Sequence, residues 1–260
     1  MDVNADILGP VDLGSFLIVL ARGAGFAGFA PAWGVPGLDW RIRLGLAAAL
    51  ALIVSPLVNG LVGPGPSDPV ALGRDCAGEL LLGAALGMAA GMIVASARQA
   101  GEIVGIQAGF SPAAILDPEA GEPLTPIGHL YGMVATAAFL ALDGPMTLVH
   151  ALAESYEQWP PGGPSLSVAT ISRAFVEVQA ALGLALRVAS PVALALMLAG
   201  FALGLLGRAA PALQALTLAL PARTAIGLIL VFLGLGTLVG LVSGAWADLP
   251  ARLAMLPPGP

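Results

Sequence analysis

The sequence predicts an all-α, polytopic membrane protein, and three features carry that prediction. Hydrophobic residues make up 58% of the 260 residues, whereas charged residues make up only 10%. Soluble domains carry about 25% charged residues. The mean hydropathy is +0.92, and the apolar residues gather into stretches of the length that a membrane helix needs, about 20 residues. Lipid or partner proteins must therefore cover most of this surface.

The apolar stretches predict about six helical segments, several of them broken, that pack as helical hairpins. Arg22 interrupts the first stretch, Pro56 the second, and Arg187 with Pro191 the fifth. No linker separates soluble domains, so we expect a single membrane domain over residues 1–260. The expected segments, with loops between them, are Leu13–Ala32, Leu44–Val62, Cys76–Ala97, Ile127–Leu152, Phe175–Leu206 and Ala225–Ala247.

Glycines recur four residues apart in three places. On a helix this spacing puts them on one face. A face without side chains lets another helix approach closely, which promotes association where hydrophobicity cannot drive it. We therefore expect helix packing along these faces, within the chain or against partners, with chance spacing as the alternative. The triplets are Gly83, Gly87 and Gly91; Gly101, Gly105 and Gly109; and Gly236, Gly240 and Gly244.

The stretch from Arg98 to Pro126 is too polar for a membrane span and too apolar for an ordinary solvated loop. Ser111-Pro112 and Asp117-Pro118 favour turns. Irregular backbone at membrane depth must line a cavity or pack on protein, which is one interpretation of the stretch. An amphipathic segment lying at the membrane interface is the other. The residues alone leave both open.

The residue patterns of common catalytic sites are missing from the sequence. All ten basic residues are arginine, so a lysine-containing phosphate loop is excluded. His129 and His150 lack the spacing of a zinc site, and Cys76 is a lone thiol. The acidic stretch Asp117–Glu122 favours a solvated turn over acid–base catalysis. A net charge of -6 offers no basic stripe. We expect no enzyme, cofactor, metal site or nucleic-acid partner.

Two charged residues fall in the fifth apolar stretch, Glu177 and Arg187. An arginine at the centre of a membrane helix costs about 2.5–3.5 kcal/mol on insertion scales, so it is expected to face protein or water. A structural ion pair with another subunit is the favoured interpretation. A proton relay, as in a secondary transporter, is the alternative.

One segment resembles a known family. Residues 101–111, Gly-Glu-Ile-Val-Gly-Ile-Gln-Ala-Gly-Phe-Ser, followed by Asp117-Pro118, are similar to the signature of the FliR family. These are membrane subunits of the bacterial flagellar export gate, related to the SctT proteins of injectisomes, and the segment is nearer to the flagellar branch. Further resemblances cover nearly the whole chain, at Leu142–Gly144, Trp159–Gly163, Gly204–Gln214 and Pro221. The chain departs from the pattern at Pro112 and at Asp143, where asparagine is common.

The resemblance implies a function. A FliR-type subunit assembles with FliP and FliQ into the channel for unfolded flagellar proteins, with FlhA and FlhB as further partners, in the lipid of the bacterial inner membrane at the basal body. It also implies a FliP-like part at 1–153 and a FliQ-like helical hairpin at 174–260. It places a pore plug at Ile106, Gln107, Gly109, Phe110, Ser111, Pro112, Ile115, Leu116 and Asp117.

Two other functions compete with the export gate. The breaks at Pro56 and Pro191 suggest a six-span solute transporter, whose binding site broken helices would form. The two halves of the sequence carry no evident internal repeat, which counts against that hypothesis. A passive membrane scaffold is the third hypothesis.

Overall fold

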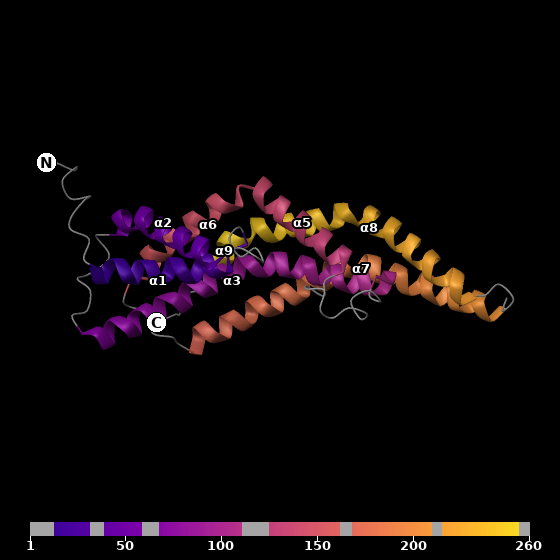
Figure 1. Ribbon diagram of the computed structural model, residues 1–260, viewed down its shortest axis with the longest axis horizontal. Helices are drawn as coiled ribbons and strands as arrows, with labels where there is room; N and C mark the ends of the chain where they lie inside the picture. Colours follow the sequence, from indigo (N-terminus) through magenta and orange to yellow (C-terminus); the bar gives the residue numbers. More distant parts are fainter. Residues whose placement is uncertain are drawn as a thin grey trace. The chain divides into compact units, whose positions relative to one another are not determined.

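The computed structural model describes residues 13–31, 39–58, 68–110, 125–161, 168–209 and 215–254. These residues form helices joined by turns, and no strand occurs among them, which confirms the all-α class. The helices, labelled as in Figure 1, are α1 (Leu13–Phe29), α2 (Trp40–Val58), α3 (Pro69–Ala108), α5 (Pro126–Ala141), α6 (Gly144–Gln158), α7 (Val168–Ala209), α8 (Ala215–Ala247) and α9 (Leu249–Ala254).

Three stretches of the described chain are long and apolar enough to cross a membrane: Pro69–Ala108, Val176–Arg208 and Pro221–Ala247. Counting α5 with α6 as one broken span gives up to four, and α1 is a shorter apolar helix. The polytopic helical membrane protein predicted from hydropathy is therefore confirmed. The expected number of about six segments is approximate.

The helices extend beyond the apolar stretches that predicted them. The loop expected from Arg98 is instead helical through Ala108, and α3 begins at Pro69 rather than near Cys76. Hydropathy marks the residues that tolerate lipid, whereas backbone hydrogen bonds and caps set where a helix ends. Polar residues can thus continue a helix past its apolar part.

The fourth expected segment is divided at Asp143. This residue has φ of 51° and ψ of 34°, a left-handed conformation in which it precedes α6. Aspartate is one of the few residues other than glycine that adopt this conformation readily. The turn at Leu142–Gly144 therefore ends α5 and starts α6.

Pro191 does not end α7, although the sequence suggested a break there. A proline has no amide hydrogen, so the carbonyl four residues earlier loses its helical partner. That carbonyl belongs to Arg187, and the Ser190 hydroxyl donates a hydrogen bond to it at 3.2 Å. Such side-chain compensation lets apolar helices tolerate proline.

The chain forms two compact units. Unit 1 comprises Met1–Met92, Asp143–Val178 and Trp246–Pro260. Unit 2 comprises Ile93–Leu142 and Gln179–Ala245. This partition does not test the FliP-like part at 1–153 and the FliQ-like helical hairpin at 174–260 expected from the resemblance, and both stay a prediction.

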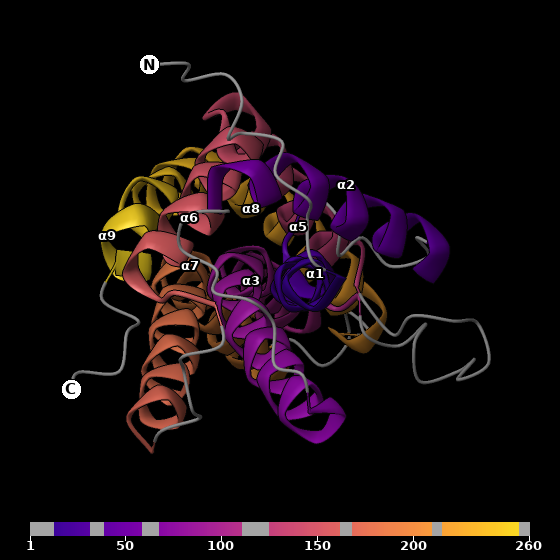
Figure 2. The ribbon, with the colours of Figure 1, turned by 90° about the vertical axis from the view of Figure 1, so that its left-hand side faces the viewer.

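Unit 1 is built on a close approach between α1 and α3, which lie side by side in Figure 2. A Cβ atom added to Gly83 would collide with the carbonyl of Arg22, and one added to Gly87 with the carbonyl of Phe26. A Cβ added to Gly91 would lie 2.5 Å from the carbonyl oxygen of Phe29. On the other helix, Gly25 faces the backbone of Leu80 in the same way. Glycines on both helices therefore permit backbone contact.

Unit 2 contains long parts of α7 and α8 that run side by side (Figure 1). A Cβ added to Gly234 on α8 would lie 2.9 Å from Val192 of α7, and Gly227 faces Leu196. Most of the outer surface of this pair is apolar and open: only 22% of each candidate span is buried. Lipid or another protein must cover that surface.

We predict that Gly83→Ala destabilises unit 1 by about 1–3 kcal/mol, because the new methyl group would force α1 away from α3. Gly73→Ala is the matched control, since Gly73 lies on the same helix with nothing within 4 Å. That change should be neutral or stabilising by up to about 1 kcal/mol. Thermal unfolding of the detergent-solubilised chain measures both. Equal melting temperatures for the two variants would contradict the close approach.

Candidate functional site

The end of α3 is set by Gly109. Its φ of 92° is left-handed, a conformation that glycine adopts without strain. The Gly109 amide donates to the Ile106 carbonyl at 3.2 Å, and the Phe110 amide donates to the Gly105 carbonyl at 3.0 Å. Together these bonds form a Schellman motif, which satisfies the last carbonyls of a helix. The helix therefore stops sharply within the predicted plug.

The predicted plug residues fall on both sides of this helix end. Ile106 and Gln107 lie in the last turn of α3, with the Ile106 residue 56% exposed. Gly109 and Phe110 follow directly. The remaining members, Ser111, Pro112, Ile115, Leu116 and Asp117, lie outside the described residues. Their role as a plug stays a prediction.

The end of α3 packs against α7 and α8 within unit 2. The Thr224 hydroxyl of α8 donates to the Ala108 carbonyl at 3.0 Å. A Cβ added to Gly227 would lie 2.6 Å from the Ala108 Cβ and 3.6 Å from the Leu196 side chain. Ala108 is therefore buried against α8, whereas Gly109 and Phe110 are half-buried.

Two polar atoms beside this contact have no hydrogen-bond partner within the described part of the chain. They are the Oε1 of Gln107 and the Nε of Arg223, both buried. Gln107 precedes Ala108 in the sequence, and Arg223 precedes Thr224, so both residues are sequence neighbours of the hydrogen bond that joins α3 to α8. Buried polar groups normally find partners. Groups beyond the described residues are expected to supply them.

The start of α5 docks on the glycine face at the end of α3. Cβ atoms added to Gly101 would lie 2.6 Å from the Ile127 carbonyl, and those added to Gly105 would collide with Thr125. Between these glycines, Glu102 accepts hydrogen bonds at its Oε1 from the Thr125 amide at 2.7 Å and the Thr125 hydroxyl at 3.2 Å. The first described residues after the predicted plug, at the start of α5, are therefore held against α3.

Unit 1 contains a second polar cluster, in which Arg22 of α1 is completely buried. Its Nε forms an ion pair with Glu79 of α3 at 2.5 Å, and Glu79 is equally buried. One terminal nitrogen donates to the carbonyl and hydroxyl of Ser155 at 3.0 and 3.1 Å. The other donates to the Trp159 carbonyl at 2.9 Å. The guanidinium lies 4.0 Å from the ring centroid of Tyr156.

This cluster joins α1, α3 and α6. The Tyr156 hydroxyl adds a hydrogen bond to the Val19 carbonyl at 3.1 Å. Sequence analysis noted Arg22 only as an interruption and missed its partner Glu79. The available signal was a second charge inside an apolar stretch, because a buried charge must be paired and hydrogen-bonded.

Comparison with known proteins identifies the family. Residues 13–249 match the family described as "Bacterial export proteins, family 1". The flagellar biosynthetic protein FliR of Caulobacter vibrioides is 29% identical over 238 residues, which cover 89% of this chain and 90% of the relative. FliR of Escherichia coli K12 is 30% identical over 197 residues, covering 72% and 71%. The chain belongs to the FliR family of bacterial export proteins.

The FliR family assignment extends to injectisome relatives. The Yop proteins translocation protein T of Yersinia pestis is 30% identical over 194 residues, which cover 73% of each chain. The family resemblance predicted from residues 101–111 is thereby confirmed. With its apolar helices, this FliR-family chain is an integral membrane component of bacterial protein export machinery.

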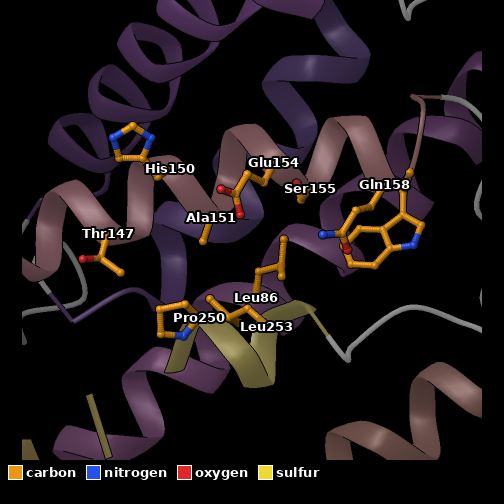
Figure 3. Close-up of a pocket in the computed structure, with 10 residues that line it drawn as sticks. Leu86, Thr147, His150, Ala151, Glu154, Ser155, Gln158, Pro250 and Leu253 are labelled. Carbon is orange, nitrogen blue, oxygen red and sulfur yellow. The ribbon is translucent and has the colours of Figure 1, made fainter. Parts of the chain in front are cut away.

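A cavity of about 270 Å³ lies between α6 and α9 in unit 1 (Figure 3). Thr147, His150, Glu154 and Gln158 line it from one face of α6, and Leu253 lines it from α9. His150 and Glu154 lie four residues apart on this face, about one helical turn. The described residues hold no cluster of metal-binding side chains. We assign this pair no chemistry.

The two charges expected to pair with another subunit differ in surroundings. Glu177 has a partner within the FliR-family chain itself, since Arg252 lies 3.9 Å from its carboxylate. Arg187 is exposed and has no ion pair with the other described residues. Its pairing with another subunit stays a prediction.

The three predicted glycine faces have different surroundings. Gly83, Gly87 and Gly91 face α1, and Gly101 and Gly105 face α5. Gly109 caps α3. In contrast, Cβ atoms added to Gly236, Gly240 or Gly244 on α8 would meet nothing within 4 Å in the described chain. Packing along this last face of the FliR-family chain therefore needs a partner and remains a prediction.

We predict that Arg22→Ala destabilises the chain by about 3–5 kcal/mol, because Glu79 would stay buried without its counter-charge. Arg74→Ala is the control, since that side chain is 80% exposed and pairs with Asp75 at 3.3 Å. A surface pair contributes only about 0–1 kcal/mol. Thermal unfolding in detergent measures both variants. A loss for Arg22→Ala no larger than that for Arg74→Ala would contradict a structural role of the buried pair.

Proposed function

We propose that this protein is a subunit of the flagellar type III export gate, located in the bacterial inner membrane at the basal body. It assembles with FliP and FliQ into the channel through which unfolded flagellar proteins leave the cytoplasm, next to FlhA and FlhB. The observation that carries the proposal is the family match over residues 13–249, together with two flagellar relatives that cover most of the chain. The match favours export over a solute transporter or a passive scaffold.

The open faces of α7 and α8 support assembly with other subunits. Large apolar side chains on α8, among them Phe232 and Leu233, are 76% and 72% exposed. The bare face at Gly236, Gly240 and Gly244 lies on the same helix. A bare glycine face permits the close helix contact by which membrane helices associate. In our proposal, helices of FliP and FliQ cover these faces, and lipid covers the remainder.

The segment Ile106–Asp117 closes the channel at rest in this proposal. A pore wide enough for an unfolded chain would leak ions, and each charge that crosses dissipates about 2.3 kcal/mol per 100 mV. Ile106, Phe110, Ile115 and Leu116 supply apolar side chains, which close a pore by excluding water. The hydrogen bond from Thr224 of α8 to the Ala108 carbonyl, next to Gly109, supports this assignment, because irregular backbone at membrane depth requires a protein or water-filled surrounding.

We predict that a strain lacking the gene assembles neither hook nor filament and does not swim. Export of both structures would stop at the first stage that requires the channel. Electron microscopy of isolated basal bodies and a soft-agar motility assay measure the effect, and expression of the intact gene from a plasmid should restore swimming. A deletion strain that still builds hook and filament would end the proposal.

We predict that deleting Phe110–Leu116 leaves the complex with FliP and FliQ assembled but raises its conductance to small ions. Replacing Phe110, Ile115 and Leu116 together by serine should also leak, since the segment keeps its length but loses its apolar surface. Met146→Ser is the control, because that residue is 59% exposed and lies on α6, away from the open faces of α7 and α8. Conductance of the reconstituted complex is the measurement. A deletion complex as tight as the unaltered one would place the seal elsewhere, such as a ring of FliP side chains.

A further inference from the structure

One apolar face of α7 begins and ends at an exposed arginine. Arg187 and Arg208 are both exposed, and neither forms an ion pair with another described residue. Between them, six large apolar residues are 52–69% exposed and recur at positions i, i+3, i+4, i+7 and beyond, which is the spacing of one helix face. This α7 stripe comprises Leu194, Met197, Leu198, Phe201, Leu205 and Leu206.

The opposite face of α7 packs inside unit 2. Val188, Val192 and Leu196 are only 3%, 4% and 0% exposed. A Cβ added to Gly234 of α8 would lie 2.9 Å from Val192. The same stretch of α7 therefore has one face against protein and another face that the described part of the chain leaves open.

The charged residues of α7 limit where a bilayer can lie along it. The candidate span Val176–Arg208 has 33 residues, which is about 50 Å at 1.5 Å per residue. The hydrocarbon core of a bilayer is only about 30 Å thick and takes about 20 residues. An arginine exposed to hydrocarbon is costly, so the core must fall between the charges. Residues 188–207 are long enough for this, whereas residues 178–186, between Glu177 and Arg187, are too short.

The neighbouring part of α8 agrees with this position. Arg223 lies at the level of Gly200, within the stretch 188–207, and a Cβ added to Gly200 would lie 3.9 Å from its guanidinium carbon. Its Nε is buried, as expected of an arginine at hydrocarbon depth, which normally faces protein. The large residues that α8 exposes beside this stretch are all apolar: Leu228, Ile229, Phe232 and Leu233.

We propose that the α7 stripe lies against the hydrocarbon of a phospholipid bilayer, and that Arg187 and Arg208 bind lipid phosphate groups at its two surfaces. A guanidinium binds phosphate through two parallel hydrogen bonds, and a long arginine side chain at the end of a span reaches the headgroups. Lipid phosphate is then the counter-charge of Arg187, in place of the carboxylate of another subunit that the sequence favoured. The inference needs only the membrane location of the chain and does not rest on the proposed channel or its closure.

Photo-cross-linking from α7 tests the stripe in the native membrane. The photoreactive residue p-benzoylphenylalanine replaces Leu198, near the middle of the stripe, or Leu182, which is 57% exposed on the far side of Arg187. The altered gene stays at its own chromosomal locus, so that any partner subunits are present. Mass spectrometry of the purified chain identifies each adduct as phospholipid or protein. We expect phospholipid adducts to predominate at Leu198 and to be severalfold fewer at Leu182.

Variants of Arg187 test the boundary of the hydrocarbon core. Arg187→Leu should raise the phospholipid adducts at Leu182 about threefold or more, because the apolar stretch is no longer interrupted and can slide into the bilayer. Arg187→Lys keeps a cation at this position and should leave the adducts unchanged. Arg74→Leu is the matched control, since that side chain is 80% exposed on α3, and it should also change nothing.

Three outcomes would overturn the inference. Adducts at Leu198 that are mainly protein would show that a subunit covers the stripe, and adducts with FliP or FliQ would do so while supporting the proposed function. Phospholipid adducts as frequent at Leu182 as at Leu198 would place the bilayer elsewhere on α7. No response of Leu182 to Arg187→Leu would show that Arg187 does not mark the surface. Phospholipid adducts at Leu198 in a chain that does not copurify with FliP and FliQ would instead support the inference and contradict the proposed function.

Discussion

The structure depends on one constraint, the close approach of other helices to the bare face of α3. Gly83 and Gly87 bring α1 to backbone contact in unit 1. In unit 2, Gly101 faces the backbone at the start of α5, and Gly105 faces the Thr125 side chain. In lipid, hydrophobicity does not pull helices together, so close packing and polar contacts must do so. A single glycine-rich helix thereby organises both units.

The close approach of neighbouring helices also brings polar partners to the two glutamates of α3. Glu79 lies one turn before Gly83 and pairs with Arg22, while Glu102 lies between Gly101 and Gly105 and binds Thr125. Each carboxylate would be costly if left without partners inside an apolar protein. Each instead ties α3 to one neighbour at a fixed register. The polar contacts therefore specify where the helices meet, and the glycines determine how closely.

Much of this architecture could be predicted from the sequence, because hydropathy and glycine spacing are local patterns. The apolar stretches gave the helical membrane class, and four-residue glycine spacing marked the faces that lie against α1 and α5. Other features depend on contacts between distant residues. The partners of Arg22 lie 57 and more residues away, and the helix end at Gly109 rests on backbone bonds rather than polarity. The left-handed turn at Asp143 could be located by resemblance, but its conformation could not.

In our proposal, the segment Ile106–Asp117 closes an export channel at rest. An electron cryo-microscopy map of the resting complex with FliP and FliQ tests this most directly. We expect density for the segment Ile106–Asp117 inside the lumen of the resting complex. A map in which these residues lie on the outer surface, with the lumen closed by other side chains, would contradict it.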